Sequence, residues 1–117
     1  MDNTASPVQI SFRHLAPSAA MEQRIQQLAA RLARFSPNIT QCRVVVDAPP
    51  QHHEQGGRYN VRIEIALAAG GEISVERTHP GDPAHEDPYV ALRDAFRAAR
   101  RQLQDYERLH RHSVHQP

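Results

Sequence analysis

The sequence has 117 residues and a mass of 13.2 kDa, which suits one domain with one hydrophobic core. The hydrophobic fraction of 39%, the charged fraction of 23% and the net charge of +1 are those of a globular protein, and the single cysteine excludes an intramolecular disulfide framework and a multi-cysteine zinc site. No stretch approaches the roughly 20 apolar residues of a membrane span, and no secretory signal precedes the domain, so we expect a cytoplasmic protein without a membrane partner.

The first part of the chain predicts a strand, a helix and a second strand. Residues 1–7 form a polar leader that we expect to be disordered, and apolar residues alternate with polar ones over residues 8–13, as in a half-buried strand. Ser18 suits the N-cap of a helix over residues 19–35, in which apolar residues recur every three or four positions. Alternation over residues 42–46 predicts the second strand.

The next part predicts a hairpin after a long loop. Residues 48–57 are rich in Pro, Gln, His and Gly and offer no core residue. Residues 58–67 alternate throughout and show the clearest strand pattern of the chain. Gly70 and Gly71 suit a tight turn that needs a positive φ, and the alternation over residues 72–76 predicts an antiparallel fourth strand.

A second polar loop, over residues 78–86, precedes the second predicted helix. Asp87 suits its N-cap and Pro88 its first position. The helix is expected to extend to about His110, and residues 111–117 are expected to form a flexible tail. Its apolar stripe has steps of three and four residues and consists of Tyr89, Leu92, Phe96, Ala99, Leu103 and Tyr106.

The predicted order of elements is therefore β-α-β-β-β-α, in one domain over residues 8–110. Amphipathic helices and one-sided strands both bury their apolar faces when the two helices pack on one face of a four-stranded sheet. The sequence predicts this two-layer α+β fold, which resembles the folds of double-stranded-RNA-binding domains.

Charge is distributed unevenly along the chain. The net charge is +3 over residues 1–46, −5 over residues 47–87 and +3 over residues 88–117. All 14 basic residues are arginine. A guanidinium group binds phosphate through two hydrogen bonds, whereas an ammonium group acts as a point charge. A GC-rich genome, which favours arginine codons, is the alternative explanation of this preference.

The arginines of the two predicted helices recur at helical spacing, so those of each helix share a side. If the helices pack side by side, they form one basic face that could bind the phosphates of folded RNA. The alternative is a solvated surface of intrahelical ion pairs with Asp94, Asp105 and Glu107. The candidate RNA-binding arginines are Arg24, Arg31, Arg34, Arg93, Arg97, Arg100, Arg101 and Arg108.

Tyr89 completes the candidate RNA-binding set, because a tyrosine at the start of a helix could stack on a base. The alternative, which the sequence favours, is that Tyr89 lies at the edge of the core and Asp87 serves only as a cap.

Metal, cofactor and catalytic sites are not indicated. The eight histidines do not have the spacing of a zinc motif, and the polar loops contain neither a nucleophile elbow nor a phosphate-binding glycine loop. We therefore expect a protein that is not an enzyme, with no metal, cofactor or small-molecule substrate.

The same residues resemble the ribosome hibernation promoting factors, a family also described as ribosome-associated inhibitor A or sigma-54 modulation proteins. The match covers roughly residues 8–110, and it is carried by three segments: Ser18–Phe35, Gly70–Ile73 and Glu86–Leu103. Within them, Arg31 and Arg101 match the family's basic helix residues, while Asp87 and Tyr89 match the start of its second helix.

The resemblance implies a bacterial or plastid protein that binds the small ribosomal subunit and its ribosomal RNA. Such a protein occupies the decoding channel, overlaps the sites of messenger and transfer RNA, and silences ribosomes under stress. The chain ends soon after the second helix, as in the family's short forms, and we expect a monomer. Glu22, Ala98, Asp105 and Glu107 depart from family positions that are often basic. The alternative function is a non-enzymatic protein-binding regulatory module that uses the acidic sheet and loops.

Overall fold

The computed structural model describes residues 8–48, 59–77 and 87–114, with side chains described up to residue 109. The predicted leader, most of both long loops and residues 115–117 lie outside the described residues. The elements are β1 (Val8–Arg13), α1 (Ala19–Phe35), β2 (Ile39–Asp47), β3 (Asn60–Leu67), β4 (Glu72–Arg77) and α2 (Pro88–Val114). The predicted order β-α-β-β-β-α is confirmed.

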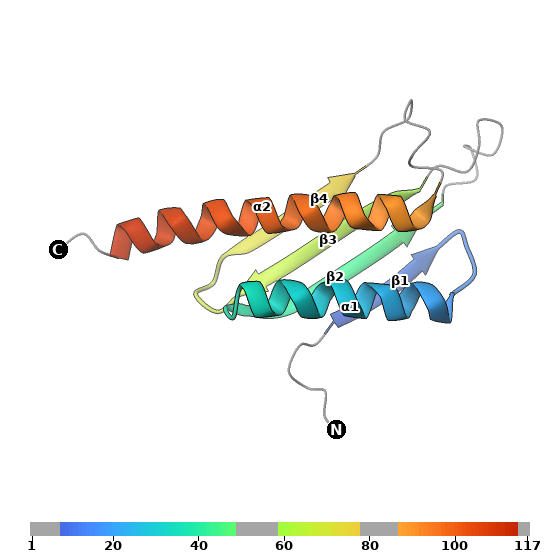
Figure 1. The fold of residues 1–117 in the computed structure, drawn as a ribbon, viewed down its shortest axis with the longest axis horizontal. Helices are drawn as coiled ribbons and strands as arrows, with labels where there is room; N and C mark the ends of the chain where they lie inside the picture. The colour runs from blue at the N-terminus through green and yellow to red at the C-terminus, as the bar shows by residue number, and fades with distance from the viewer. Residues whose placement is uncertain (1–7, 49–58, 78–86, 115–117) are drawn as a thin grey trace, which may run out of the picture.

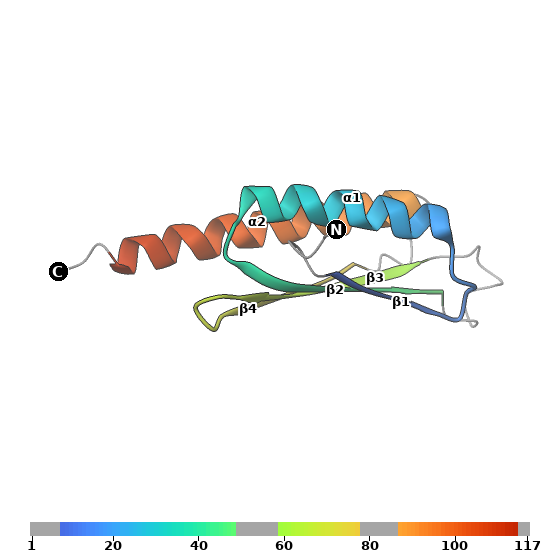
Figure 2. The ribbon, with the colours of Figure 1, turned by 90° about the horizontal axis from the view of Figure 1, so that it is seen from below.

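The four strands form one sheet in the order β1-β2-β3-β4 (Figure 1). Strand β1 runs parallel to β2, which requires the crossover that α1 provides, and the other two strand pairs are antiparallel. Both helices lie side by side on the same face of the sheet, as the two views together show (Figures 1 and 2). The two-layer α+β fold is therefore confirmed, and no helix among the described residues covers the opposite face of the sheet.

Both predicted helix caps are present. The Ser18 hydroxyl accepts a hydrogen bond from the backbone N–H of Met21 at 3.1 Å, and the Asp87 carboxylate accepts one from the N–H of Tyr89 at 2.9 Å. Each bond satisfies a backbone donor that the first turn of a helix leaves free. In the β3–β4 turn Gly70 has a φ of 98°, the conformation for which glycine is favoured.

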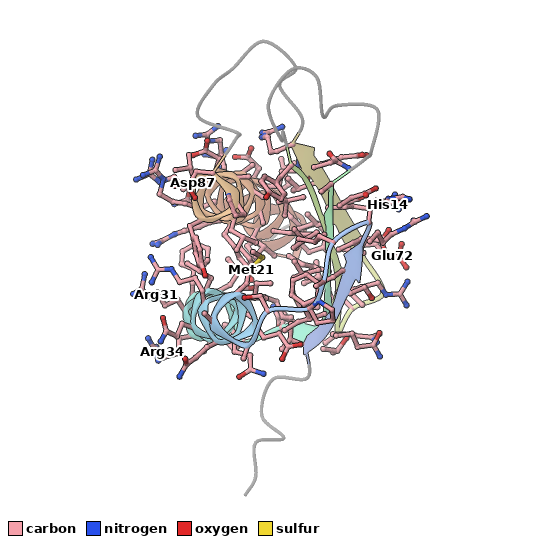
Figure 3. All side chains as sticks on the ribbon, turned by 90° about the vertical axis from the view of Figure 1, so that its right-hand side faces the viewer. His14, Met21, Arg31, Arg34, Glu72 and Asp87 are labelled. Atoms are coloured by element: carbon pink, nitrogen blue, oxygen red, sulfur yellow. The ribbon has the colours of Figure 1, made fainter. Side chains whose placement is uncertain are left out.

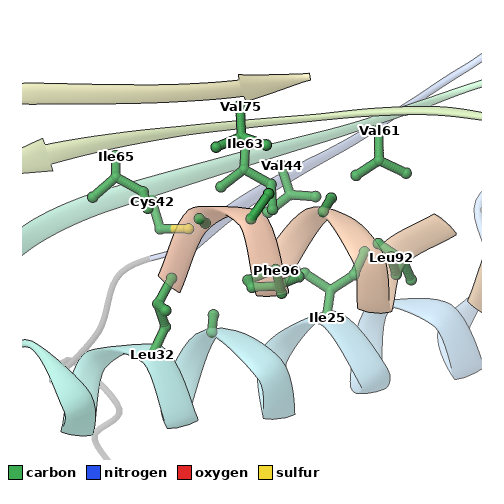
Figure 4. Packing of buried hydrophobic residues seen from close by; sticks show 14 of the residues in the cluster. Ile25, Leu32, Cys42, Val44, Val61, Ile63, Ile65, Val75, Leu92 and Phe96 are labelled. Carbon is green, nitrogen blue, oxygen red and sulfur yellow. The ribbon is translucent and has the colours of Figure 1, made fainter. Parts of the chain in front are cut away.

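The core lies between the helices and the sheet (Figure 4). Ile25 and Leu32 of α1 and Leu92 and Phe96 of α2 pack against the inward side chains of the strands. Cys42 of β2 belongs to this layer, and burial raises the pKa of its thiol from 9.0 to about 11.

Two elements are longer than predicted. Strand β2 begins at Ile39, and α2 continues to Val114 rather than ending near His110, so residues 111–114 of the predicted tail are helical. At 1.5 Å per residue, the 27 residues of α2 span about 40 Å. Its C-terminal part projects past α1 and the sheet (Figures 1 and 2). The extension lacks a strong apolar pattern, which is why periodicity did not find it.

Candidate nucleic-acid interface

A groove of about 270 Å³ lies between α1 and α2. Arg31, one of the residues that line it, points away from the sheet (Figure 3). Arginines from both helices line the groove together with four apolar side chains. The arginines are Arg24, Arg31, Arg93, Arg97 and Arg100, and the apolar residues are Leu28, Leu32, Phe35 and Phe96. We call this feature the arginine groove. None of the described residues that line it is acidic.

The apolar residues of the arginine groove belong to the stripes by which the helices pack. Leu32 and Phe96 are buried, while Leu28 and Phe35 lie at the edge of the core and are half-buried. The guanidinium carbon of Arg100 lies 4.3 Å from the centre of the Phe35 ring, so the cation of one helix stacks on an aromatic side chain of the other. The groove therefore combines a planar cation with an apolar surface.

The five arginines of the groove are all exposed, and their partners are weak. Arg93 forms an ion pair with Asp94 at 3.6 Å, and Arg24 donates a hydrogen bond to Gln27 at 3.4 Å. Among the described residues, Arg31 and Arg97 have no carboxylate within ion-pair distance. Several positive charges that neighbouring acids do not neutralise attract a polyanion.

The structure brings together five of the eight predicted arginines and leaves three apart. Arg34, Arg101 and Arg108 are exposed but do not line the groove. In Figure 3 both Arg31 and Arg34 point away from the sheet, on the side opposite Glu72. Arg108 forms an ion pair with Asp105 at 2.7 Å, which is the intrahelical pairing that the alternative interpretation predicts.

Tyr89 lies at the end of the same surface. With 41% of its area exposed, it is not part of the apolar stripe to which the sequence assigned it, so the edge-of-core interpretation is wrong. It lines a second, open hollow of about 480 Å³ with Gln23, Arg24 and Gln27, and Arg24 therefore borders both hollows. Tyr89 is the second residue of α2, and the first side chains of this helix that are buried in the core are those of Ala91 and Leu92.

Three of the four departures from the family pattern have local explanations. Ala98 is 4% exposed, so a long basic side chain would not fit there without disturbing the core. Asp105 is the ion-pair partner of Arg108, and Glu22 lies in the first turn of α1, where a negative charge is favourable.

The fourth departure, Glu107, ties α2 to the end of α1. Its carboxylate accepts a hydrogen bond from the hydroxyl of Ser36, which is completely buried. The two residues are 71 positions apart in the chain. The bond satisfies a buried hydroxyl and ties α2 to Ser36, the residue that caps the end of α1.

The outer face of the sheet, which is the face without helices, carries a mixture of charges. Its charged residues are Arg13, Arg43, Asp47, Arg62, Glu64, Glu72 and Glu76. Glu64 lies 3.7 Å from Arg43 and 3.6 Å from Arg62, and the carboxylate of Asp47 lies 2.8 Å from the His14 ring nitrogen. The expectation of an acidic sheet is therefore wrong for this face, because three arginines offset four carboxylates.

The outer face of the sheet does not carry all of the negative charge of residues 47–87. Of the acidic residues counted in the middle of the sequence, Glu54, Asp82 and Glu86 are outside the described residues.

The described residues contain no group of three or more His, Cys, Asp or Glu side chains that could hold a metal ion. Within the same ranges, neither helix is long and apolar enough to cross a membrane.

Comparisons with known proteins place this geometry in a family. The sequence matches the family described as Sigma 54 modulation protein / S30EA ribosomal protein over residues 8–111. A comparison with curated proteins gave no match.

Solved structures share the fold. The N-terminal domain of Protein Y from Thermus thermophilus has a TM-score of 0.66 and 20% identity, with 86% of this chain and 98% of that one covered. A ribosomal subunit interface protein from Coxiella burnetii has a TM-score of 0.68 and 14% identity, with coverages of 86% and 96%. Because the family match covers nearly the whole described domain, the chain belongs to the Sigma 54 modulation protein / S30EA ribosomal protein family of ribosome-associated proteins.

Proposed function

We propose that this protein inhibits translation by binding the small ribosomal subunit with its helical layer against ribosomal RNA. The observation that carries the proposal is the arginine groove, in which five exposed arginines from two helices converge and none of the described lining residues is acidic. In this position the protein occupies the decoding channel and blocks messenger and transfer RNA by steric exclusion. It acts by binding and performs no catalysis.

Chemistry favours a phosphate partner for this surface. Guanidinium groups donate two parallel hydrogen bonds to phosphate oxygens and keep their charge at any physiological pH. Folded RNA presents a dense array of phosphates that proteins recognise largely by shape. Arg34 and Arg101 lie on the same helices outside the groove, and Tyr89 lies at its end, so in our proposal they widen the contact.

The outer face of the sheet supports the alternative, a protein-binding regulatory module, less well. Glu64 forms ion pairs with Arg43 and Arg62, and three arginines stand against four carboxylates on the face as a whole, so the face has little net charge to select a charged partner. A shallow hollow of about 420 Å³ on this face is lined by Gln41, Arg43, Glu64 and Ser74 among others, and it contains both signs of charge. We therefore assign the ribosome contact to the helices.

Cosedimentation tests the proposal. The protein should migrate with small subunits or whole ribosomes at low salt and be released at high salt, since phosphate contacts release counterions. The double variant Arg97→Glu/Arg101→Glu should lose this association while its circular dichroism stays unchanged, because both side chains are exposed. Retained cosedimentation of a folded double variant would contradict the proposal.

An inhibition assay adds the functional readout. Addition of the protein to a translation extract should reduce synthesis and reduce the binding of transfer RNA to small subunits in parallel. Binding to ribosomes without any effect on transfer RNA would place the protein outside the decoding channel.

A further inference from the structure

The arginine groove has a property that a pure phosphate site would not need, which is its apolar floor. Leu28, Leu32, Phe35 and Phe96 lie between the arginines of the two helices. Phosphate oxygens gain nothing from contact with aliphatic and aromatic carbon. The floor therefore indicates that the ligand presents an apolar, planar part as well as negative charge.

The size of the groove limits what that part can be. Its volume of about 270 Å³ is close to the lower end of the range of small-ligand sites, roughly 300–1,000 Å³. This space admits one planar group, whereas an RNA duplex keeps its bases stacked and paired inside the helix. Bases become available when a strand is single or a nucleotide is bulged out.

The Arg100–Phe35 pair is a preformed stacking platform. The guanidinium group lies 4.3 Å from the ring centre, and the pair joins the last residue of α1 to the middle of α2. A delocalised planar cation held over an aromatic ring leaves its other surface for a further planar group. Unstacked RNA bases are commonly held on such aromatic and guanidinium surfaces.

We infer that the arginine groove binds an unpaired nucleotide of RNA, with its base on the floor beside Arg100 and Phe35 and the flanking phosphates on the other arginines of the rim. This inference rests on the proposed function and makes it more specific: the site recognises single-stranded or bulged RNA and not only the phosphate backbone. The rim cations are Arg24, Arg31, Arg93 and Arg97.

Two probes of equal charge test the inference. One is a short single-stranded RNA oligonucleotide, and the other is an oligomer of the same length whose nucleotides lack bases. Fluorescence anisotropy should show at least about tenfold tighter binding of the base-bearing strand, as base stacking in other single-strand sites implies. A 2-aminopurine base in the first probe should change its fluorescence on binding.

The variant Arg100→Lys keeps the positive charge and removes the planar guanidinium group. It should reduce the preference for the base-bearing probe by roughly threefold or more, with little change in affinity for the abasic probe. The matched control is Arg43→Lys on the outer face of the sheet, which should leave the preference unchanged. Circular dichroism checks that both variants are folded.

The outcomes separate this inference from the function on which it rests. Equal affinity for the two probes would overturn the inference even if the protein still cosediments with ribosomes. Equally tight binding of a polyglutamate peptide would also overturn it, since the groove would then be a site for acidic protein segments. Failure to cosediment with ribosomes, combined with a clear preference for bases, would contradict the proposed function alone.

Discussion

The two exposed surfaces of this domain both carry arginines and use them differently. On the outer face of the sheet, Arg43 lies beside Glu64 because the pairing of β2 with β3 places these two residues opposite each other. Arg62 lies beside Glu64 because it is two positions earlier on the same strand and its side chain is on the same face. Between the helices, arginines from α1 and α2 face a common groove that no acidic side chain lines among the described residues. The first arrangement neutralises charge, and the second concentrates it.

The difference shows that the presence of arginines does not by itself identify a binding surface. The partner of each arginine depends on what the fold places beside it, and in the part of the chain that the structure describes only the interhelical groove leaves cations together over an apolar floor. An exposed ion pair contributes little to stability, about 0–1 kcal/mol, so the pairs on the sheet mainly determine net charge.

Removal of the apolar floor should have the largest effect on the fold. Phe96 is 5% exposed and is part of both the core and the arginine groove. The substitution Phe96→Ala should lower the free energy of unfolding by about 3–5 kcal/mol, because it removes buried area and leaves a cavity. Urea denaturation measures the change, and a loss below about 1 kcal/mol would mean that Phe96 packs poorly.

Alkaline pH should weaken the inner face of the sheet through Cys42. Burial raises the pKa of its thiol from 9.0 to about 11, so the unfolded chain releases this proton more readily than the folded one. The contribution is fully present below pH 9 and is lost as the pH rises to about 11, for a total of about 2–3 kcal/mol. Between pH 9 and about 11, the free energy of unfolding of the wild type should fall more steeply with pH than that of Cys42→Ala. Parallel curves would contradict it.

The hydrogen bond between Ser36 and Glu107 should contribute less to the free energy of unfolding than the packing of Phe96 does. Ser36→Ala leaves the carboxylate of Glu107 without its buried donor and should cost roughly 1–3 kcal/mol. In a double-mutant cycle with Glu107→Ala, which removes the acceptor, the two effects should not add, because the residues share one hydrogen bond. Additive effects would show that the bond does not join the helices in solution.

Neutralisation of the outer face should have the smallest effect on ribosome binding. The triple variant Glu64→Gln/Glu72→Gln/Glu76→Gln should change affinity for ribosomes by less than about twofold and should raise affinity for bulk RNA, because negative charge is removed from a surface that makes no specific contact. Filter binding against both ligands measures the two effects. A folded triple variant that no longer binds ribosomes would move the contact to the sheet.

Local signals in the sequence were sufficient for the fold. Alternation and helical spacing predicted the strands and helices, and Ser18 and Asp87 marked the starts of both helices, because these features depend on residues a few positions apart. The end of α2 at Val114 was missed because the last turns of this helix have no core to face.

The site was predicted in part. Helical spacing identified the arginines, but which of them share a groove depends on how the two helices pack. The sequence pattern assigns the four apolar residues of the groove entirely to the core. The pattern that indicates their place in the groove is the seven-residue spacing of Leu28 and Phe35, which puts these residues in a line along α1 beside Arg24 and Arg31. The stack of Arg100 on Phe35 and the bond of Ser36 to Glu107 join distant parts of the chain, so no local pattern reveals them.

The most direct measurement compares two pairs of substitutions that change the net charge equally. Arg31→Gln/Arg97→Gln removes two cations from the arginine groove, and Arg13→Gln/Arg43→Gln removes two from the outer face of the sheet. Equilibrium binding to purified small subunits at one fixed salt concentration should weaken by at least about tenfold for the groove pair and by less than about twofold for the sheet pair. Equal weakening by both folded variants would mean that net charge alone drives the association, and it would contradict the assignment of ribosome binding to the arginine groove.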